Sequence, residues 1–293
     1  MKATDSAIKP LKNSQFWLLG IGGGLIAILL TLVWRTGDDS YLGISVLCLF
    51  AVASTLVEKR HKLTLESGIF PSILGITFIG FILWQSANLH HGKWLKTFLH
   101  ISPFISAIGL SLLASGLKGF KQFWQELTIL FFLGVPKVTI LSLIDITPLA
   151  TLTAKYSTLL LWYTGFEVSL QDNYINLPTG GIKVAGECAG LEWMCHLLSL
   201  AVIGLFMFPP KPKRRILVPI VAVFVAFLVN GARIAILAVM AAKQHQPTFH
   251  YWHVGGGSSV FGIITVLIFG LFYWFLLHEQ EIKKQNIAES SSQ

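Results

Sequence analysis

The sequence contains few charged residues. Only 12% of its 293 residues are Asp, Glu, Lys or Arg, whereas a soluble domain usually carries about a quarter. Hydrophobic residues make up 54% and occur in long runs, which excludes an ordinary soluble protein and indicates a polytopic membrane protein. The net charge of +8 does not predict a nucleic-acid partner, because the positive residues lie between apolar runs, as in cytoplasmic loops.

Cysteine is also scarce, and two common catalytic motifs are missing. The only cysteines are Cys48, Cys188 and Cys195, which excludes a disulfide framework. Cys48 lies within an apolar run and is expected to be a buried small hydrophobe. The chain has no Gly-x-Ser-x-Gly and no His-Glu-x-x-His, the patterns of serine hydrolases and zinc proteases. We expect neither a metal nor a cofactor.

Apolar runs long enough to cross a bilayer, which takes about 20 residues, set the fold class. The eight candidates are residues 16–34, 41–57, 69–87, 98–117, 124–145, 189–208, 216–240 and 255–277. They predict an all-α polytopic membrane protein with about eight transmembrane helices. Residues 1–293 should form one integral membrane domain, with its core at 16–277 and a disordered polar tail at 278–293.

Two segments in the middle of the chain leave alternatives open. Pro136-Lys137 interrupts the fifth run, which is therefore either one bent helix or a helix followed by a re-entrant piece. Residues 148–165 are apolar but contain Lys155, and we expect a helix that lies at the membrane interface.

Lysine and arginine indicate the direction of the spans. With the N-terminus in the cytoplasm, the inside segments hold most of the 22 basic residues: Lys2, Lys9, Lys12, Lys59, Arg60, Lys62, Lys118, Lys121, Lys211, Lys213, Arg214, Arg215, Lys283 and Lys284. The strongest single signal is "PPKPKRR", from Pro209 to Arg215. The positive-inside rule therefore places both termini and this loop in the cytoplasm.

The segment between Phe166 and Cys188 differs from the rest of the chain. In "FEVSLQDNYINLPTGGIKVAGEC", polar and apolar residues alternate on either side of Pro178-Thr179-Gly180-Gly181. This pattern predicts a β-hairpin with a four-residue turn. The hairpin should stand on the extracytoplasmic side, directly before Cys188.

Three reactive side chains are predicted to lie at one depth in the membrane. Cys188 opens the sixth span at its outer end, and His253 stands just before the eighth. Arg233 is 18 residues beyond Arg215, about 27 Å along a helix, which carries it across most of the hydrocarbon core. The three therefore belong to consecutive spans and to the same face of the membrane.

These residue types suit thiol chemistry. Cys188 could act as a nucleophile, with His253 taking its proton and returning it to a leaving group. Arg233 could stabilise the thiolate or an oxyanion. Asn230, three residues before Arg233 on one helix face, could orient it or donate to the oxyanion. Glu192, one turn past Cys188, could tune the thiol or bind Arg233.

Each residue also has a plainer interpretation. A helical cysteine is more often a packing residue, an arginine can extend outward to the interface, and Asn230 could join helices by a hydrogen bond. The alternative function is a polytopic transporter or scaffold in which Arg233 binds an anion. The two functions differ at Cys188, because a transporter should tolerate Cys188→Ser and a thiol enzyme should not.

Three segments together resemble the exosortase/archaeosortase family, most closely its cyanobacterial branch. They are "GGIKVAGECAGLEWM", "NGARIAI" and "HVGGG". They match a hairpin ending in Cys-[Ser/Ala]-Gly-Leu, then Asn-x-x-Arg, then His-x-x-x-Gly at the head of the last helix. The resemblance covers residues 16–277. Ala189 stands where many members have serine, and Glu192 stands where many have arginine.

The resemblance implies a membrane-embedded cysteine transpeptidase or protease with Cys188, Arg233 and His253 as its triad. His250 stays as a second candidate for the histidine. The implied partners, besides the lipid bilayer, are exported proteins with a C-terminal Pro-Glu-Pro-type sorting signal. The acceptor is a glycan, a lipid or water. The implied location is the plasma (inner) membrane, with the site on the extracytoplasmic side.

The topology can be tested by cysteine labelling in intact cells. Single cysteines are introduced as Lys213→Cys and Asp172→Cys, and the cells are treated with an impermeant maleimide. We expect labelling at position 172 and none at 213 until the cells are broken, because the basic loop is cytoplasmic and the hairpin is outside. The reverse pattern would overturn the orientation.

Overall fold

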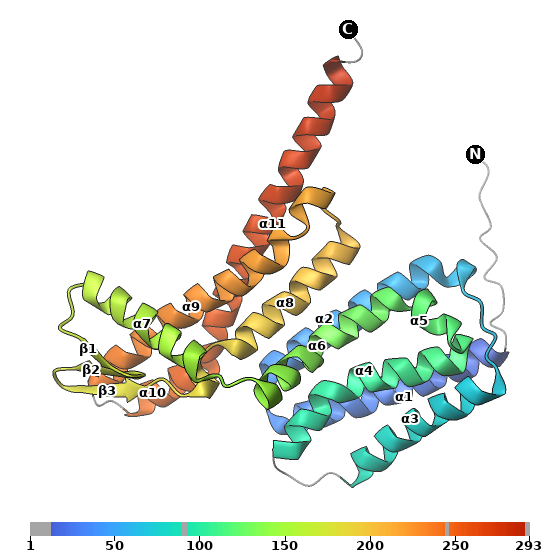
Figure 1. Cartoon of the computed structure of the whole chain (residues 1–293), viewed down its shortest axis with the longest axis horizontal. Coiled ribbons are helices and arrows are strands. Elements are labelled where there is room, and N and C mark those ends of the chain that lie inside the picture. Colours follow the sequence, from blue (N-terminus) through green and yellow to red (C-terminus); the bar gives the residue numbers. More distant parts are fainter. Residues whose placement is uncertain (1–12, 89–92, 244–245, 291–293) are drawn as a thin grey trace. The chain divides into compact units, whose positions relative to one another are not determined.

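A computed structural model describes residues 13–88, 93–243 and 246–290, which fall into two compact units (Figure 1). The units comprise residues 1–131 and 132–293. Some basic residues used for the orientation lie outside the described residues or have side chains that are not described: Lys2, Lys9, Lys12, Lys283 and Lys284.

The first unit is a set of membrane-length helices. Its elements are α1 (Asn13–Thr36), α2 (Asp39–Lys59), a 3₁₀ turn (Arg60–Lys62), α3 (Ile69–Ala87), α4 (Lys93–Ser115), the short α5 (Lys118–Gln122) and the first part of α6 (Trp124–Leu143). Helix α4 packs against α1 and α3. A Cβ on Gly75 of α3 would lie 2.7 Å from the carbonyl oxygen of Gly109 on α4, so glycine permits this close approach.

The second unit contains the candidate reactive residues. It comprises the rest of α6, then α7 (Thr147–Tyr163), β1 (Ser169–Gln171), β2 (Tyr174–Leu177), β3 (Gly180–Lys183), a 3₁₀ turn (Gly186–Cys188), α8 (Leu191–Met207), a second 3₁₀ turn (Pro212–Arg214), α9 (Leu217–Ala242), α10 (Gln246–His253) and α11 (Gly256–Ser290). Helix α9 is its centre, because α7, α8, α10, α11, β2 and β3 all pack against it.

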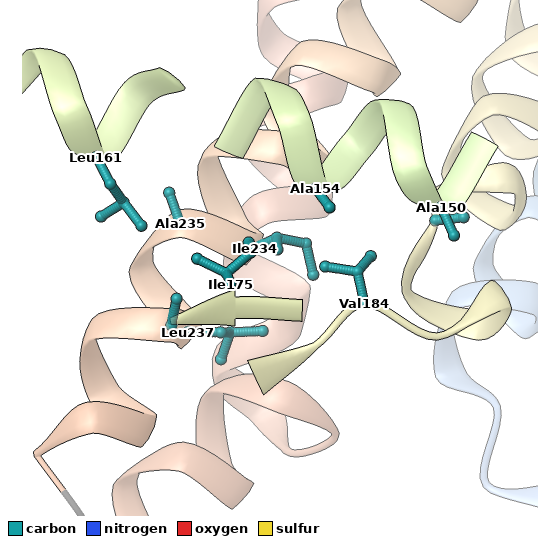
Figure 2. Close-up of a cluster of buried hydrophobic side chains, with 10 residues drawn as sticks. Ala150, Ala154, Leu161, Ile175, Val184, Ile234, Ala235 and Leu237 are labelled. Atoms are coloured by element: carbon teal, nitrogen blue, oxygen red, sulfur yellow. The ribbon is translucent and has the colours of Figure 1, made fainter. Parts of the chain in front are cut away.

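A buried apolar cluster joins α7, α9 and the small sheet (Figure 2). Alanines on α7 allow the helix to lie close to Ile234 and Leu237 of α9, and Ile175 of β2 closes the cluster. Cys188 and Ala189 pack against the same cluster. The apolar core therefore holds the segment that carries the candidate nucleophile.

The predicted spans are confirmed. Eight helices of the described chain are long and apolar enough to cross a membrane: residues 15–36, 39–62, 69–87, 94–115, 124–143, 186–207, 212–242 and 256–279. Pro136 lies inside α6, which is one helix rather than a helix and a re-entrant piece. The helix predicted at 148–165 is confirmed by α7. Its position at the membrane interface stays a prediction.

The segment between Phe166 and Cys188 forms three antiparallel strands in the order β1-β2-β3, and not only a hairpin. Leu177 pairs with Gly180, so the β2–β3 connection has two residues rather than the expected four. The strand β1 was missed because its turn to β2 lacks glycine. Asp172 stands there with a φ of 56°, a left-handed conformation that aspartate tolerates better than most residues.

Helix α11 extends further than the sequence suggested. It continues to Ser290, so most of the segment expected to be a disordered tail is helical. Glutamate, lysine, glutamine and alanine favour helix, and a helix that continues from an apolar span needs no new nucleation. Arg214 donates two hydrogen bonds to Glu279 at 2.6 and 2.8 Å, which joins the basic loop to α11.

Candidate active site

The structure brings together the three side chains that the sequence placed at one depth. Cys188 ends the 3₁₀ turn before α8, Arg233 lies within α9, and His253 is the last residue of α10. The Sγ atom of Cys188 is 3.3 Å from Nε2 of His253. Nη2 of Arg233 donates to the main-chain carbonyl of His253 at 2.6 Å.

A tight turn over residues 186–190, here called the nucleophile turn, presents Cys188. The amides of Cys188 and Ala189 donate to the carbonyls of Ala185 and Gly186 at 2.9 and 3.2 Å. Gly190 has a φ of 91°, and a Cβ there would lie 2.7 Å from Nδ2 of Asn230. Glycine is therefore required on two grounds, the left-handed backbone and the close approach of the asparagine.

Asn230 connects the nucleophile turn to the arginine. Its side chain is buried, its Nδ2 donates to the carbonyl of Cys188 at 3.0 Å, and its Oδ1 accepts from Nη1 of Arg233 at 3.4 Å. The contact with Nη1 thus supports the expected role of Asn230 in orienting Arg233. One N–H of Nδ2 binds the main chain of the turn, and donation to an oxyanion by its second N–H stays a prediction.

Arg233 is a buried cation in an apolar helix, exposed over only 7% of its surface. A charge in such surroundings is costly unless protein groups bind it. Its two terminal nitrogens reach Asn230 and His253, whereas Nε has no hydrogen-bond partner among the described residues. One buried donor of the guanidinium is therefore left for another group.

His253 is the histidine that contacts the thiol. It is partly buried and packs against Phe249, whereas His250 on the same helix is exposed. Burial lowers the pKa of His253 below its ordinary value of 6.5, the positive charges of Arg233 and His250 lower it further, and Glu187 opposes them. The imidazole is therefore neutral near pH 7, the state in which it can accept a proton.

Glu192 has a partner that the sequence did not suggest. Its carboxylate forms an ion pair with Lys137 on α6. The two residues are 55 positions apart in the chain, and no sequence spacing relates them. Lys137, which the sequence showed only as part of the interruption in the fifth run, is thus the ion-pair partner of Glu192. The expected roles of Glu192 in tuning Cys188 or binding Arg233 stay predictions.

Two hydroxyl groups of α7 support the site and were missed. Thr153 donates to the carbonyl of Ala189 at 3.0 Å, and Ser157 donates to the carbonyl of Gly231 at 2.8 Å. The sequence did contain a signal for them, since Thr153 and Ser157 lie four residues apart and beside Ala150 and Ala154. Such a small and polar face is typical of close packing between membrane helices.

In the described parts of the chain, no group of three or more His, Cys, Asp or Glu side chains could hold a metal ion. A thiol in contact with a neutral imidazole can transfer its proton and attack an electrophilic carbon.

Comparisons with known proteins found similarities over most of the chain. A family model described as transmembrane exosortase matches residues 21–270. The chain is also similar to a protein named probable archaeosortase E from Methanocaldococcus jannaschii, with 26% identity over 104 residues, 36% of this chain and 54% of that protein. The chain thus spans about half the length of this curated relative. No solved structure matches it.

The lowered pKa of His253 predicts how stability depends on pH. The unfolded chain binds this proton at higher pH than the folded chain, so the residue favours folding above about pH 6.5. That contribution is lost as the pH falls through the folded-state pKa. We expect thermal stability in detergent to decline less between about pH 7 and pH 5 in His253→Asn than in the parent.

His250→Asn is the matched control, because it removes an exposed histidine of the same helix. It should keep most of the parental decline. An equal decline in the parent and in His253→Asn would contradict the lowered pKa.

Proposed function

The chain belongs to the transmembrane exosortase family, and we propose that it is a membrane-embedded cysteine transpeptidase or protease that processes exported proteins. Its substrates would carry a C-terminal sorting signal: a Pro-Glu-Pro-type motif, one membrane helix and a basic tail. The family membership supports a role in protein sorting at the membrane. The signal motif, the triad and the placement in the cyanobacterial branch are parts of the proposal.

The observation that carries the proposal is the 3.3 Å contact between Sγ of Cys188 and Nε2 of His253. In the first step, His253 takes the thiol proton while sulfur attacks the carbonyl carbon of the scissile peptide bond. The tetrahedral intermediate then breaks its carbon–nitrogen bond. His253 returns the proton to the leaving nitrogen, the membrane helix departs, and the exported part stays on Cys188 as a thioester.

In the second step, an acceptor group attacks the thioester. The acceptor is a hydroxyl or amine of a glycan or lipid, or water, and His253 takes its proton and returns it to the sulfur. Cys188 packs on one side against the buried apolar cluster of α7, α9 and the small sheet, which limits the access of water from that side. This surrounding favours transfer to an acceptor over hydrolysis.

Arg233 has two roles in this mechanism. Its contact with the carbonyl of His253 holds the imidazole beside the thiol. Its positive charge stabilises the thiolate, and the unpartnered Nε can donate to the oxyanion of the tetrahedral intermediate. A transporter in which Arg233 binds an anion remains the alternative, and the contact between Cys188 and His253 favours the thiol enzyme over it.

The location follows from the same proposal. The eight spans make the chain a multi-pass membrane protein. We place it in the plasma (inner) membrane with both termini in the cytoplasm. The active site then opens to the extracytoplasmic side, where an exported protein presents the peptide next to its own membrane helix.

Replacing the nucleophile tests the proposal most directly. A tagged exported protein with a candidate sorting signal is expressed with the parent or with Cys188→Ala, and the loss of its C-terminal helix is followed on gels. We expect processing to stop, because no other group of the site can form the thioester. Cys48→Ala removes a buried cysteine of the other unit and should process normally. Continued processing by Cys188→Ala would place the nucleophile elsewhere.

Arg233→Lys distinguishes directional hydrogen bonding by the guanidinium from the effect of a positive charge alone. Lysine keeps the charge but loses the planar fork, so it cannot reproduce the contacts with Asn230 and His253. We expect processing to fall on the order of a hundredfold in the same gel assay. Arg215→Lys in the basic loop is the control and should process normally. Near-parental activity of Arg233→Lys would show that charge alone suffices.

A further inference from the structure

We propose that Thr153 of α7 is a positioning residue that holds the nucleophile turn and so places Cys188 against His253. This inference rests on the proposed function and deepens it. It assigns a role to a helix that carries none of the three sequence motifs. Thr153 is fully buried, and its Oγ1 donates to the carbonyl of Ala189 at 3.0 Å.

Two consecutive carbonyls of the turn are bound by side chains from different helices. Asn230 of α9 donates to the carbonyl of Cys188, and Thr153 of α7 donates to the next carbonyl, that of Ala189. Two neighbouring peptide planes fix the backbone dihedrals of the residue between them. Here that residue is Ala189, so the pair of bonds fixes the peptide plane that follows Cys188, while the amide of Cys188, bound to the carbonyl of Ala185, fixes the plane before it. Thr153 therefore supports the main chain of Cys188 through its neighbour Ala189.

These carbonyls depend on side-chain donors. They precede α8, whose first hydrogen-bonded acceptor is the carbonyl of Gly190, bound by the amide of Met194 at 3.1 Å. Ala189 is fully buried, so water does not replace a missing donor there. A buried carbonyl without a donor is unfavourable, and the turn would shift if the hydroxyl were removed.

Helix α7 is itself fixed to α9, which makes it a suitable support. Ser157 donates to the carbonyl of Gly231, and a Cβ on Gly231 would lie 2.2 Å from the ring of Tyr156. The two helices therefore approach as closely as the missing side chain allows. Since α9 also carries Arg233, which binds the carbonyl of His253, one rigid frame holds both the sulfur and the imidazole.

The first experiment compares two threonines of α7. Thr153→Val keeps the shape of the side chain and removes the hydroxyl that binds the turn. Thr158→Val is the matched control, because the hydroxyl of Thr158 is buried on the same helix with no hydrogen-bond partner among the described residues. Thr153→Ser retains the hydroxyl donor and should restore the behaviour of the parent.

The readout is the rate at which Cys188 reacts with a small alkylating reagent, measured on the full-length protein in detergent with Cys48 and Cys195 replaced by alanine. We expect Thr153→Val to slow alkylation on the order of tenfold, because the sulfur moves away from its base. Thr158→Val and Thr153→Ser should react at the parental rate. A parental rate in folded Thr153→Val would overturn the proposal.

A double-mutant cycle with His253→Ala separates positioning from general loosening. If Thr153 acts by placing the sulfur beside the imidazole, Thr153→Val should have little further effect once His253 is gone. If it acts only through overall stability, the two effects should multiply, and the positioning role would be wrong.

The alkylation assay needs no substrate, so the two proposals can fail separately. If Cys188→Ala still processes a substrate, the proposed function fails whatever Thr153 does. If Cys188→Ala is inactive but Thr153→Val alkylates and processes like the parent, only the positioning role fails.

Discussion

The burial of Arg233 is the constraint on which the site depends. A buried guanidinium in an apolar helix has to be bound by protein oxygen atoms, because the hydrocarbon core of the membrane offers none. The main-chain carbonyl of His253 is one of them, at 2.6 Å, and the amide oxygen of Asn230 is another. Binding the charge therefore also fixes the end of α10, and with it the imidazole that contacts Cys188.

Two glycines in and near the nucleophile turn matter as much as the reactive side chains, because each leaves room for a close approach. Gly190 lets the turn adopt a left-handed conformation directly against Asn230, and Gly231 lets α7 lie against α9. A turn held this closely from two sides has its geometry before a substrate arrives. Such preorganisation favours catalysis, because little reorganisation is left for the reaction itself.

Two ion pairs neutralise charged side chains elsewhere in the helices. Glu126 is buried in α6 and is paired by Lys59 at 2.6 Å within the first unit. In the second unit, Glu192 stands one turn past Cys188 and is paired by Lys137. These two carboxylates thus have lysine partners, and Glu192 is partly neutralised by a residue outside the sequence motifs.

The sequence by itself determined the spans, and it predicted one depth for the reactive residues, because helical rise converts residue number into position along the membrane normal. It therefore brought Cys188, Arg233 and His253 to one level before any contact was known. Only the tertiary structure decided that His253 rather than His250 meets the sulfur, that Glu192 binds Lys137, and that Thr153 holds the turn. The reason is physical: the rise fixes how deep a side chain lies, whereas its direction around the helix axis is set by packing against neighbours that are distant in the chain.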